Sequence, residues 1–145
     1  MRYARYPIIA TDDYHRYFFF SEGPRGKIAK GVIYSQIGYN LYNLSFGDWN
    51  ERVQYLDDSS RSNNSDRDKV LATVASTALD FIGKYPEAQI FVEGSTAART
   101  RLYQMGINNN LMEINKVVKV QGFTNEKWQP FRQGTNYEAF LIQRK

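Results

Sequence analysis

The residues best placed to do chemistry lie in one short stretch of the second half of the chain. Ser95, Thr96, Arg99 and Tyr103 bring hydroxyls, a guanidinium and a phenol close together in sequence. Hydroxyls at a helix start accept bonds from its first N–H groups, and such a terminus beside an arginine favours an anion. We therefore predict an anion-binding site at Ser95, Thr96 and Arg99. Arg99 and Tyr103 are the predicted catalytic pair, as charge stabiliser and proton donor.

A strand, a turn and a helix are expected to position these side chains. Residues 89–93 are rich in β-formers and lead into Gly94, and the helix is predicted from Ala97 to Met105. Gly106 is predicted to close this helix in the left-handed conformation. Both ends of the stretch thus carry residues typical of helix termini.

Angular position divides the residues of this helix into two groups. At about 100° per residue, Ala98, Leu102 and Met105 are predicted to form the buried stripe. Arg99 and Tyr103 lie together on one flank of that stripe, where they can face a ligand. An alternative needs no ligand: an ordinary helix cap, an arginine paired with a surface acid and a tyrosine half in the core.

Length and composition indicate a single domain, residues 1–145, long enough to bury its own core. The chain has no cysteine, which excludes disulfides, thiolate catalysis and cysteine zinc sites and favours a cytoplasmic location. The sequence contains no apolar stretch long enough to predict a membrane-spanning helix. A formal net charge of +4 mildly favours anionic partners. The 15% aromatic content suits base stacking, protein interfaces or a β-sheet core.

No metal site is expected. His15 is the only histidine and follows Asp12 and Asp13, so no second imidazole completes a common ligand set. Asp57 and Asp58 are adjacent, and neighbours in an extended chain point to opposite faces. A turn is therefore predicted there instead of a pair of catalytic carboxylates.

The order of predicted elements indicates an α+β fold. Strands are expected at 3–9, 17–21, 27–37, 41–46 and 52–56, with a break at 47–50. A relative of the capping box at Ser65–Asp68 starts a core helix to about Gly83. The later elements are the strand at 89–93, the second helix, a helical turn at 111–114 and strands at 117–123 and 137–143, with 128–131 in a loop or edge. The β-α-β-α order implies a parallel crossover, so the sheet is mixed but mostly antiparallel, in β-β-β-(β)-α-β-α-β-β order.

Three segments carry a resemblance to a family of small bacterial proteins of unknown function: Asn43–Asp48, Asp66–Val74 and Gly94–Ile107. That resemblance implies no activity. The element order also resembles the GNAT acetyltransferase fold, and residues 98–107 resemble one of its helices, which implies acetyl-CoA as cofactor. The chain departs from that fold at residues 63–69, which contain no glycine where those enzymes carry a glycine-rich pyrophosphate loop.

Three classes of function follow. The first is a small basic cytoplasmic domain that engages an anionic partner, RNA or a nucleotide, in its most specific form a toxin-like component of a bacterial two-component module. The second is an acyltransferase that uses acetyl-CoA, with Tyr103 as general acid. The third is a non-enzymatic protein-interaction module anchored by Trp49 and Trp128. The sequence leaves open whether the protein is an enzyme.

Overall fold

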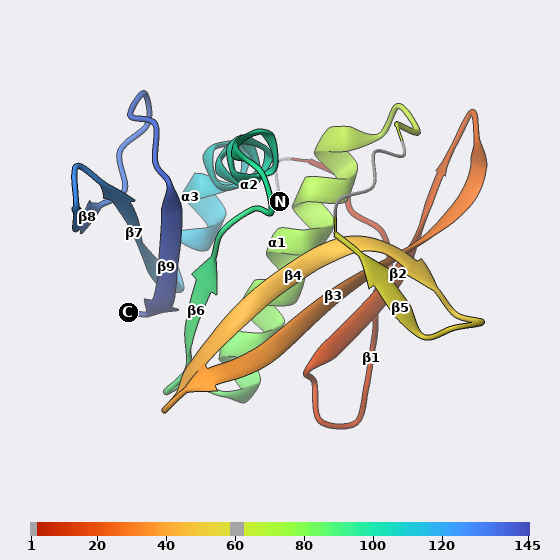
Figure 1. The fold of residues 1–145 in the computed structure, drawn as a ribbon, viewed down its shortest axis with the longest axis horizontal. Coiled ribbons are helices and arrows are strands. Elements are labelled where there is room, and N and C mark those ends of the chain that lie inside the picture. The colour runs from red at the N-terminus through yellow and green to blue at the C-terminus, as the bar shows by residue number, and fades with distance from the viewer. Residues whose placement is uncertain (1–2, 59–62) are drawn as a thin grey trace.

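The structure, a computed structural model, describes residues 3–58 and 63–145. It consists of one sheet with helices packed on one face (Figure 1). The helices are α1 (Arg67–Lys84), α2 (Ala97–Asn109) and α3 (Leu111–Ile114). The strands are β1 (Ile9–Ala10), β2 (Arg16–Gly23), β3 (Gly26–Gly38), β4 (Leu41–Asn50), β5 (Tyr55–Asp57), β6 (Gln89–Val92), β7 (Val118–Thr124), β8 (Lys127–Pro130) and β9 (Ala139–Arg144).

The sheet is mixed and mostly antiparallel, which confirms the predicted α+β class. Its strand order is β1-β2-β3-β4-β6-β9-β7-β8, with β5 also paired to β4. β4 and β6 run parallel and are joined by the crossover through α1, whereas the other pairs are antiparallel. β9 lies between β6 and β7, as expected for a strand with apolar residues on both faces.

Alternation along the strands places the core between the sheet and α1. Tyr17 of β2 pairs with Val32 of β3, which pairs with Phe46 of β4, and all three are buried. The Tyr17 hydroxyl donates to Asp80 of α1 at 2.7 Å, which fixes this face of the sheet as the one that meets the helix. Within the described residues, the opposite face carries no helix, and Figure 1 shows α1 and α3 passing behind β4 and β9.

The predicted end of α2 is wrong. The helix continues through Gly106 to Asn109, and Gly106 is not among the glycines with positive φ. A Cβ at Gly106 would lie 3.4 Å from Cβ of Leu71 in α1. Its missing side chain therefore serves the close packing of two helices and does not end one of them.

The predicted buried stripe of α2 is also wrong. Ala98 is exposed, and Leu102 and Met105 are only partly buried. The buried residues are Thr100, Tyr103, Gln104, Gly106 and Ile107. The helix is thus turned so that the flank with Tyr103 faces the core, because α1 and the sheet together cover that flank.

Two further expectations need correction. β4 does not break at residues 47–50 but runs to Asn50, since Gly47 pairs with Gly31 and the last residues pair with β5. A Cβ on Gly47 would lie 2.0 Å from the Asp57 carbonyl oxygen, so this glycine permits a close approach of two strands. The helix predicted near Ser65–Asp68 begins at Arg67, but its N-cap residue makes no side-chain capping bond.

No helix in the part of the chain that the structure describes is long and apolar enough to cross a membrane.

Candidate ligand cleft

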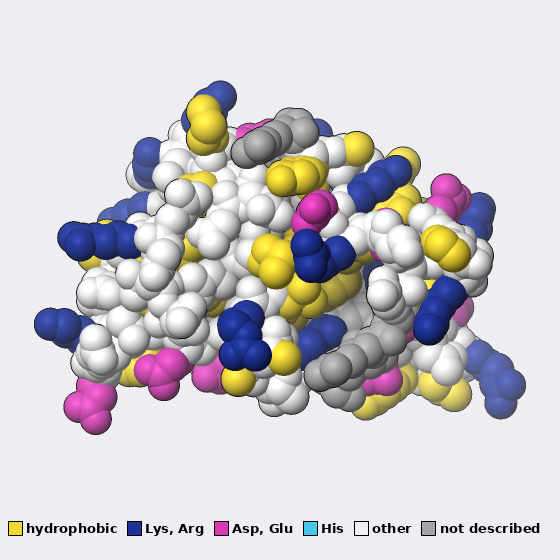
Figure 2. Space-filling view, turned by 90° about the horizontal axis from the view of Figure 1, so that it is seen from above, with side chains coloured by type: hydrophobic (Ala, Val, Ile, Leu, Met, Phe, Trp, Pro, Cys, Tyr) yellow, Lys and Arg dark blue, Asp and Glu magenta, His cyan; other side chains and the backbone are white. Residues whose placement is uncertain are grey.

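A cleft of about 540 Å³ opens where the first turns of α1 and α2 meet the second half of β4. Figure 2 shows the molecule from this side, with hydrophobic side chains in a hollow near its middle and Lys and Arg side chains around it. The residues that line the cleft are Lys30, Phe46, Gly47, Asp48, Asn63, Asn64, Asp66, Arg67, Val70, Thr96, Ala98, Arg99 and Leu102.

The cleft lies where β4 parts from β6. The last paired residues of the two strands are Leu44 and Val92, and β4 gains its next neighbour on that edge only at Asp48, in β5. Arg99 of α2 reaches into this interval, and its guanidinium donates to the Phe46 carbonyl oxygen at 2.5 Å. The same guanidinium carbon lies 5.7 Å from the centre of the Phe46 ring. Arg99 therefore bonds to the edge of β4 at Phe46, between the residues that pair with β6 and those that pair with β5.

Tyr103 lies one turn further along α2, on the same flank as Arg99, as the sequence predicts. Its side chain is buried and hydrogen-bonds to the Arg99 side chain and the Phe46 backbone. Burial raises the pKa of the Tyr103 hydroxyl, and the Arg99 charge opposes the rise only in part. The group is therefore a protonated phenol at neutral pH.

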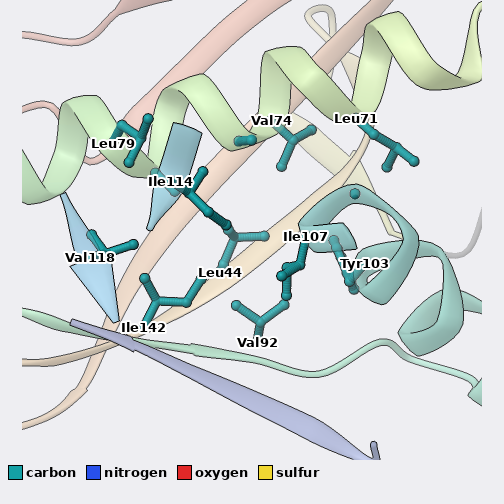
Figure 3. Close-up of a pocket in the computed structure, with 13 residues that line it drawn as sticks. Leu44, Leu71, Val74, Leu79, Val92, Tyr103, Ile107, Ile114, Val118 and Ile142 are labelled. Atoms are coloured by element: carbon teal, nitrogen blue, oxygen red, sulfur yellow. The ribbon is translucent and has the colours of Figure 1, made fainter. Parts of the chain in front are cut away.

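Tyr103 does not line the cleft itself. It lines an apolar cavity of about 50 Å³ between α1, α2, α3 and the sheet. Figure 3 shows Leu44, Val92 and Ile107 with Tyr103 among the side chains of that cavity. Tyr103 thus stands between the polar cleft, which Arg99 lines, and an apolar interior.

The hydroxyls at the start of α2 already have partners in the protein. Thr96 is the N-cap, as predicted, and its Oγ1 accepts from the Arg99 backbone N–H at 3.2 Å. The Ser95 hydroxyl donates to the Asp58 carbonyl oxygen at 3.3 Å. The Gly94 N–H donates to the Thr100 hydroxyl at 2.9 Å. Thr96 and Arg99 line the cleft and Ser95 does not; an anion held by all three stays a prediction.

The start of α1 is built differently, and sequence reasoning missed it. Asp66 is the N-cap but caps nothing with its side chain. Its Oδ2 accepts instead from the Tyr6 hydroxyl at 2.6 Å and from the Ser21 hydroxyl at 2.5 Å. Burial, and next the bond to Asp66, raise the pKa of Tyr6. The α1 terminus therefore has no capping bond from its N-cap side chain, and Asp66, Arg67 and Val70 of this end line the cleft. One feature of the sequence could have indicated this missing cap: Lys69 stands three residues after Asp66, where a capping box has Glu or Gln.

Asn64 fixes the segment that leads into α1. Its side chain accepts from the Arg25 N–H at 2.7 Å and donates to the Ser21 hydroxyl and the Gly26 carbonyl. A Cβ on Gly23 would lie 2.0 Å from the Asn64 carbonyl oxygen, so the segment is pressed against the β2–β3 hairpin. One wall of the cleft is thus anchored by buried polar bonds.

The lining carries three cations against two carboxylates: Lys30, Arg67 and Arg99 against Asp48 and Asp66. Lys30 is buried and pairs with Asp48 at 2.5 Å. Arg67 is exposed at the rim and lies 3.6 Å from Asp68. The cleft therefore combines a mildly positive lining with apolar walls, which suits a ligand with both an anionic and an apolar part.

His15 lies away from the cleft, 3.6 Å from Asp13 and packed against the rings of Tyr42 and Tyr85. Among residues 3–58 and 63–145, no three His, Cys, Asp or Glu side chains are grouped to hold a metal ion.

Comparison with known proteins adds a family but no activity. The chain matches no curated protein and no solved structure. A family model described as a family of unknown function, DUF6934, matches residues 2–145. The protein belongs to this family.

Proposed function

We propose that the cleft binds a small phosphate-bearing ligand, a nucleotide or an RNA phosphate. The observation that carries the proposal is the start of α1: its N-cap side chain makes no capping bond, and Asp66, Arg67 and Val70 of this end line a cleft that also holds Lys30 and Arg99. A helix N-terminus carries about +0.5 of an elementary charge and presents N–H donors, which suits a phosphate.

The charges around the start of α1 are mixed: Asp66 and Asp68 oppose an anion, whereas Arg67 and Arg99 attract one. Two hydroxyls donate to the Asp66 carboxylate and disperse its charge. Arg67 stands in the first turn, and Arg99 lies across the cleft on α2. A phosphate on the first turn of α1 would thus have an arginine from each helix near it.

The apolar walls support a ligand larger than phosphate. Val70, Ala98 and Leu102 line the cleft beside the ring of Phe46. A sugar and base, or another apolar group, would bury these surfaces, whereas inorganic phosphate would not. This favours a nucleotide over a free anion.

If the ligand is RNA, the pair Arg99 and Tyr103 supplies groups for cleavage. Arg99 lines the cleft and can stabilise developing negative charge. Tyr103 is a protonated phenol that does not line the cleft, so its use as proton donor requires the ligand to displace the Arg99 side chain from the Phe46 carbonyl. This is the toxin-like form of the proposal. Induced expression would arrest growth, and Tyr103→Phe would relieve the arrest; unimpaired growth with abundant folded protein contradicts this form.

Acetyl-CoA is a second candidate, favoured by a specific observation. β4 and β6 part beyond Leu44 and Val92, beside Tyr103, and an extended ligand that displaced the Arg99 side chain from Phe46 would lie between these parallel strands. In this form Tyr103 is the general acid that protonates the leaving thiolate. The strand and helix order supports this candidate, and the missing glycines at residues 63–69 count against it.

Thermal unfolding with ATP, acetyl-CoA and inorganic phosphate tests the cleft and separates the candidates. A ligand at about 100 times its dissociation constant stabilises the fold by roughly 2.7 kcal/mol. The nucleotide form predicts a rise with ATP, the acyltransferase form a larger rise with acetyl-CoA, and neither expects much from phosphate alone. No rise with any of them overturns the proposal.

Two arginines give a matched pair of variants for the same measurement. Arg67→Glu places a carboxylate at the first turn of α1 and is expected to abolish the ligand-induced rise. Arg101→Glu changes charge equally on an exposed site of α2 that does not line the cleft, so it should preserve most of the rise. Both sites are exposed, so the unliganded proteins should differ from the parent by only about 0.5 kcal/mol. Equal loss in both variants would place the binding surface elsewhere.

A further inference from the structure

The sheet face opposite the helices carries a surface of a different kind. Figure 1 shows this face in front of α1 and α3. We call it the open sheet face and define it by the side chains of β4, β6, β9, β7 and β8 that point away from the helices. The cleft lies on the helix side of β4, so the two surfaces are separate.

Strand register identifies the residues of this face. Tyr42 and Leu44 are buried toward the helices, so Asn43 between them points to the open side. Asn43 pairs with Phe91, and Phe91 pairs with Leu141 of β9. Since paired residues share a face, all three belong to the open sheet face.

Three aromatic rings gather at one end of this face. Phe123 of β7 pairs with Trp128 of β8, and their ring centres lie 5.1 Å apart. Phe91 lies edge-on to Trp128 at 6.3 Å. Trp128 at the edge is 39% exposed. These three residues form the aromatic cluster, which presents an accessible π-surface beside small Ala139.

The rest of the face mixes polar and apolar side chains and is not acidic. Amide side chains stand on neighbouring strands at Gln121, Gln89 and Gln143, and Lys119 pairs with Gln143. Along the strands that define it, the described open sheet face has no carboxylate: its side chains are amides, hydroxyls, one lysine and apolar groups. An anion can therefore approach without repulsion from the face itself.

We propose that the open sheet face binds single-stranded nucleic acid. Bases would stack on the aromatic cluster, amides would donate to and accept from base edges, and Lys119 would meet a phosphate. The combination favours nucleic acid, because stacking rings, amides and a cation lie together on a face whose described strand positions carry no carboxylate. The inference does not depend on the cleft.

Fluorescence anisotropy of labelled single-stranded RNA of roughly ten nucleotides, at about 50 mM salt, tests this proposal. Trp128→Ala is expected to weaken binding roughly 5-fold to 100-fold, as measured for the loss of a stacking ring. Trp128→Phe keeps a π-face and should retain most of the affinity. Tyr39→Ala removes an aromatic side chain that is 93% exposed outside the cluster, and should change nothing.

Further measurements distinguish RNA binding at the open sheet face from ligand binding in the cleft and from self-association. Lys119→Glu should weaken binding to every sequence and lower the salt slope by about one. Trp128 does not line the cleft, so Trp128→Ala should keep the ATP-induced rise in unfolding temperature, which distinguishes this proposal from the proposed function. Equal affinity of the parent and Trp128→Ala, or no binding, overturns the proposal. A dimer of the parent that Trp128→Ala converts to monomers, measured by light scattering, would assign the face to self-association and overturn it as well.

Discussion

The two helices that meet at the cleft begin in opposite ways. α2 starts with Thr96, whose hydroxyl caps the backbone of its own first turn. α1 starts with Asp66, whose carboxylate is bound by hydroxyls from β2 and from the chain before β1. The side chain of the first N-cap is used within its own helix, whereas the side chain of the second is used in tertiary contacts and makes no capping bond. A capping residue in the sequence thus marks where a helix starts. The anion site that we propose uses a helix start whose N-cap side chain makes no capping bond.

The largest expected effect is a loss of stability at the start of α2. A Cβ at Gly94 would lie 2.3 Å from the Thr100 backbone nitrogen, so Gly94→Ala must push the first turn of α2 away. We expect a loss of about 3 kcal/mol in the free energy of unfolding, measured by urea denaturation. Gly83→Ala is the control: nothing lies within 4 Å of its added Cβ, and alanine is the better helix former by about 0.5–1 kcal/mol. Similar stability of the two variants would contradict the packing argument.

The next largest effect is a loss of stability at the start of α1. Asp66→Ala removes the acceptor of two partly buried hydroxyls, on Tyr6 and Ser21, and should cost about 2–3 kcal/mol. Tyr6→Phe removes only one of these bonds and should cost about 1 kcal/mol. A loss for Asp66→Ala no larger than that for Tyr6→Phe would mean that the carboxylate does not hold the two elements together.

Elements with regular patterns could be predicted from the sequence, and contacts between elements could not. The meander, the crossover and the helical turn at 111–114 follow from alternation and turn residues. Gly106 has the same local signature as a helix-ending glycine, and only the position of Leu71 on α1 decides its role. Arg99 and Tyr103 could be placed on one flank from spacing alone. That this flank faces the core and the Phe46 backbone depends on how α2 lies across the sheet.

An alkaline titration sharpens the comparison, because each of the two helices is associated with a tyrosine of raised pKa. Burial is the first cause both for Tyr103, which lies within α2, and for Tyr6, whose hydroxyl bonds to the N-cap of α1. In the unfolded chain tyrosine ionises near pH ~10, so the folded protein holds protons that the unfolded chain releases above that pH. The stabilisation is complete below about pH 10 and is lost as pH rises toward the folded pKa values. Each such tyrosine contributes up to about 1.4 kcal/mol per pH unit to the slope.

Tyr103→Phe should make the fall of the free energy of unfolding with pH shallower above about pH 10. Denaturation at several pH values measures the slope, and tyrosinate absorbance reports the ionisation. Because Tyr34 and Tyr17 also have raised pKa values, a slope should persist in the variant. An unchanged slope would indicate that the Tyr103 hydroxyl is accessible to solvent, and would weaken its assignment as a protected proton donor.

The smallest effect compares neighbouring hydroxyls at the start of α2. Thr96→Ala removes the N-cap bond to the Arg99 N–H and should cost about 1 kcal/mol, the usual price of a lost cap. Ser95→Ala removes a bond from an exposed side chain to the Asp58 carbonyl, at 3.3 Å, and should cost less than about 0.5 kcal/mol.

The same two variants also test where the ligand binds. If the anion lies at the first turn of α1, both variants should bind it as the parent does once the lost stability is allowed for. If Ser95→Ala abolishes ATP-induced stabilisation while leaving the fold intact, the ligand lies at the start of α2, and the anion site predicted from the sequence there is the right one.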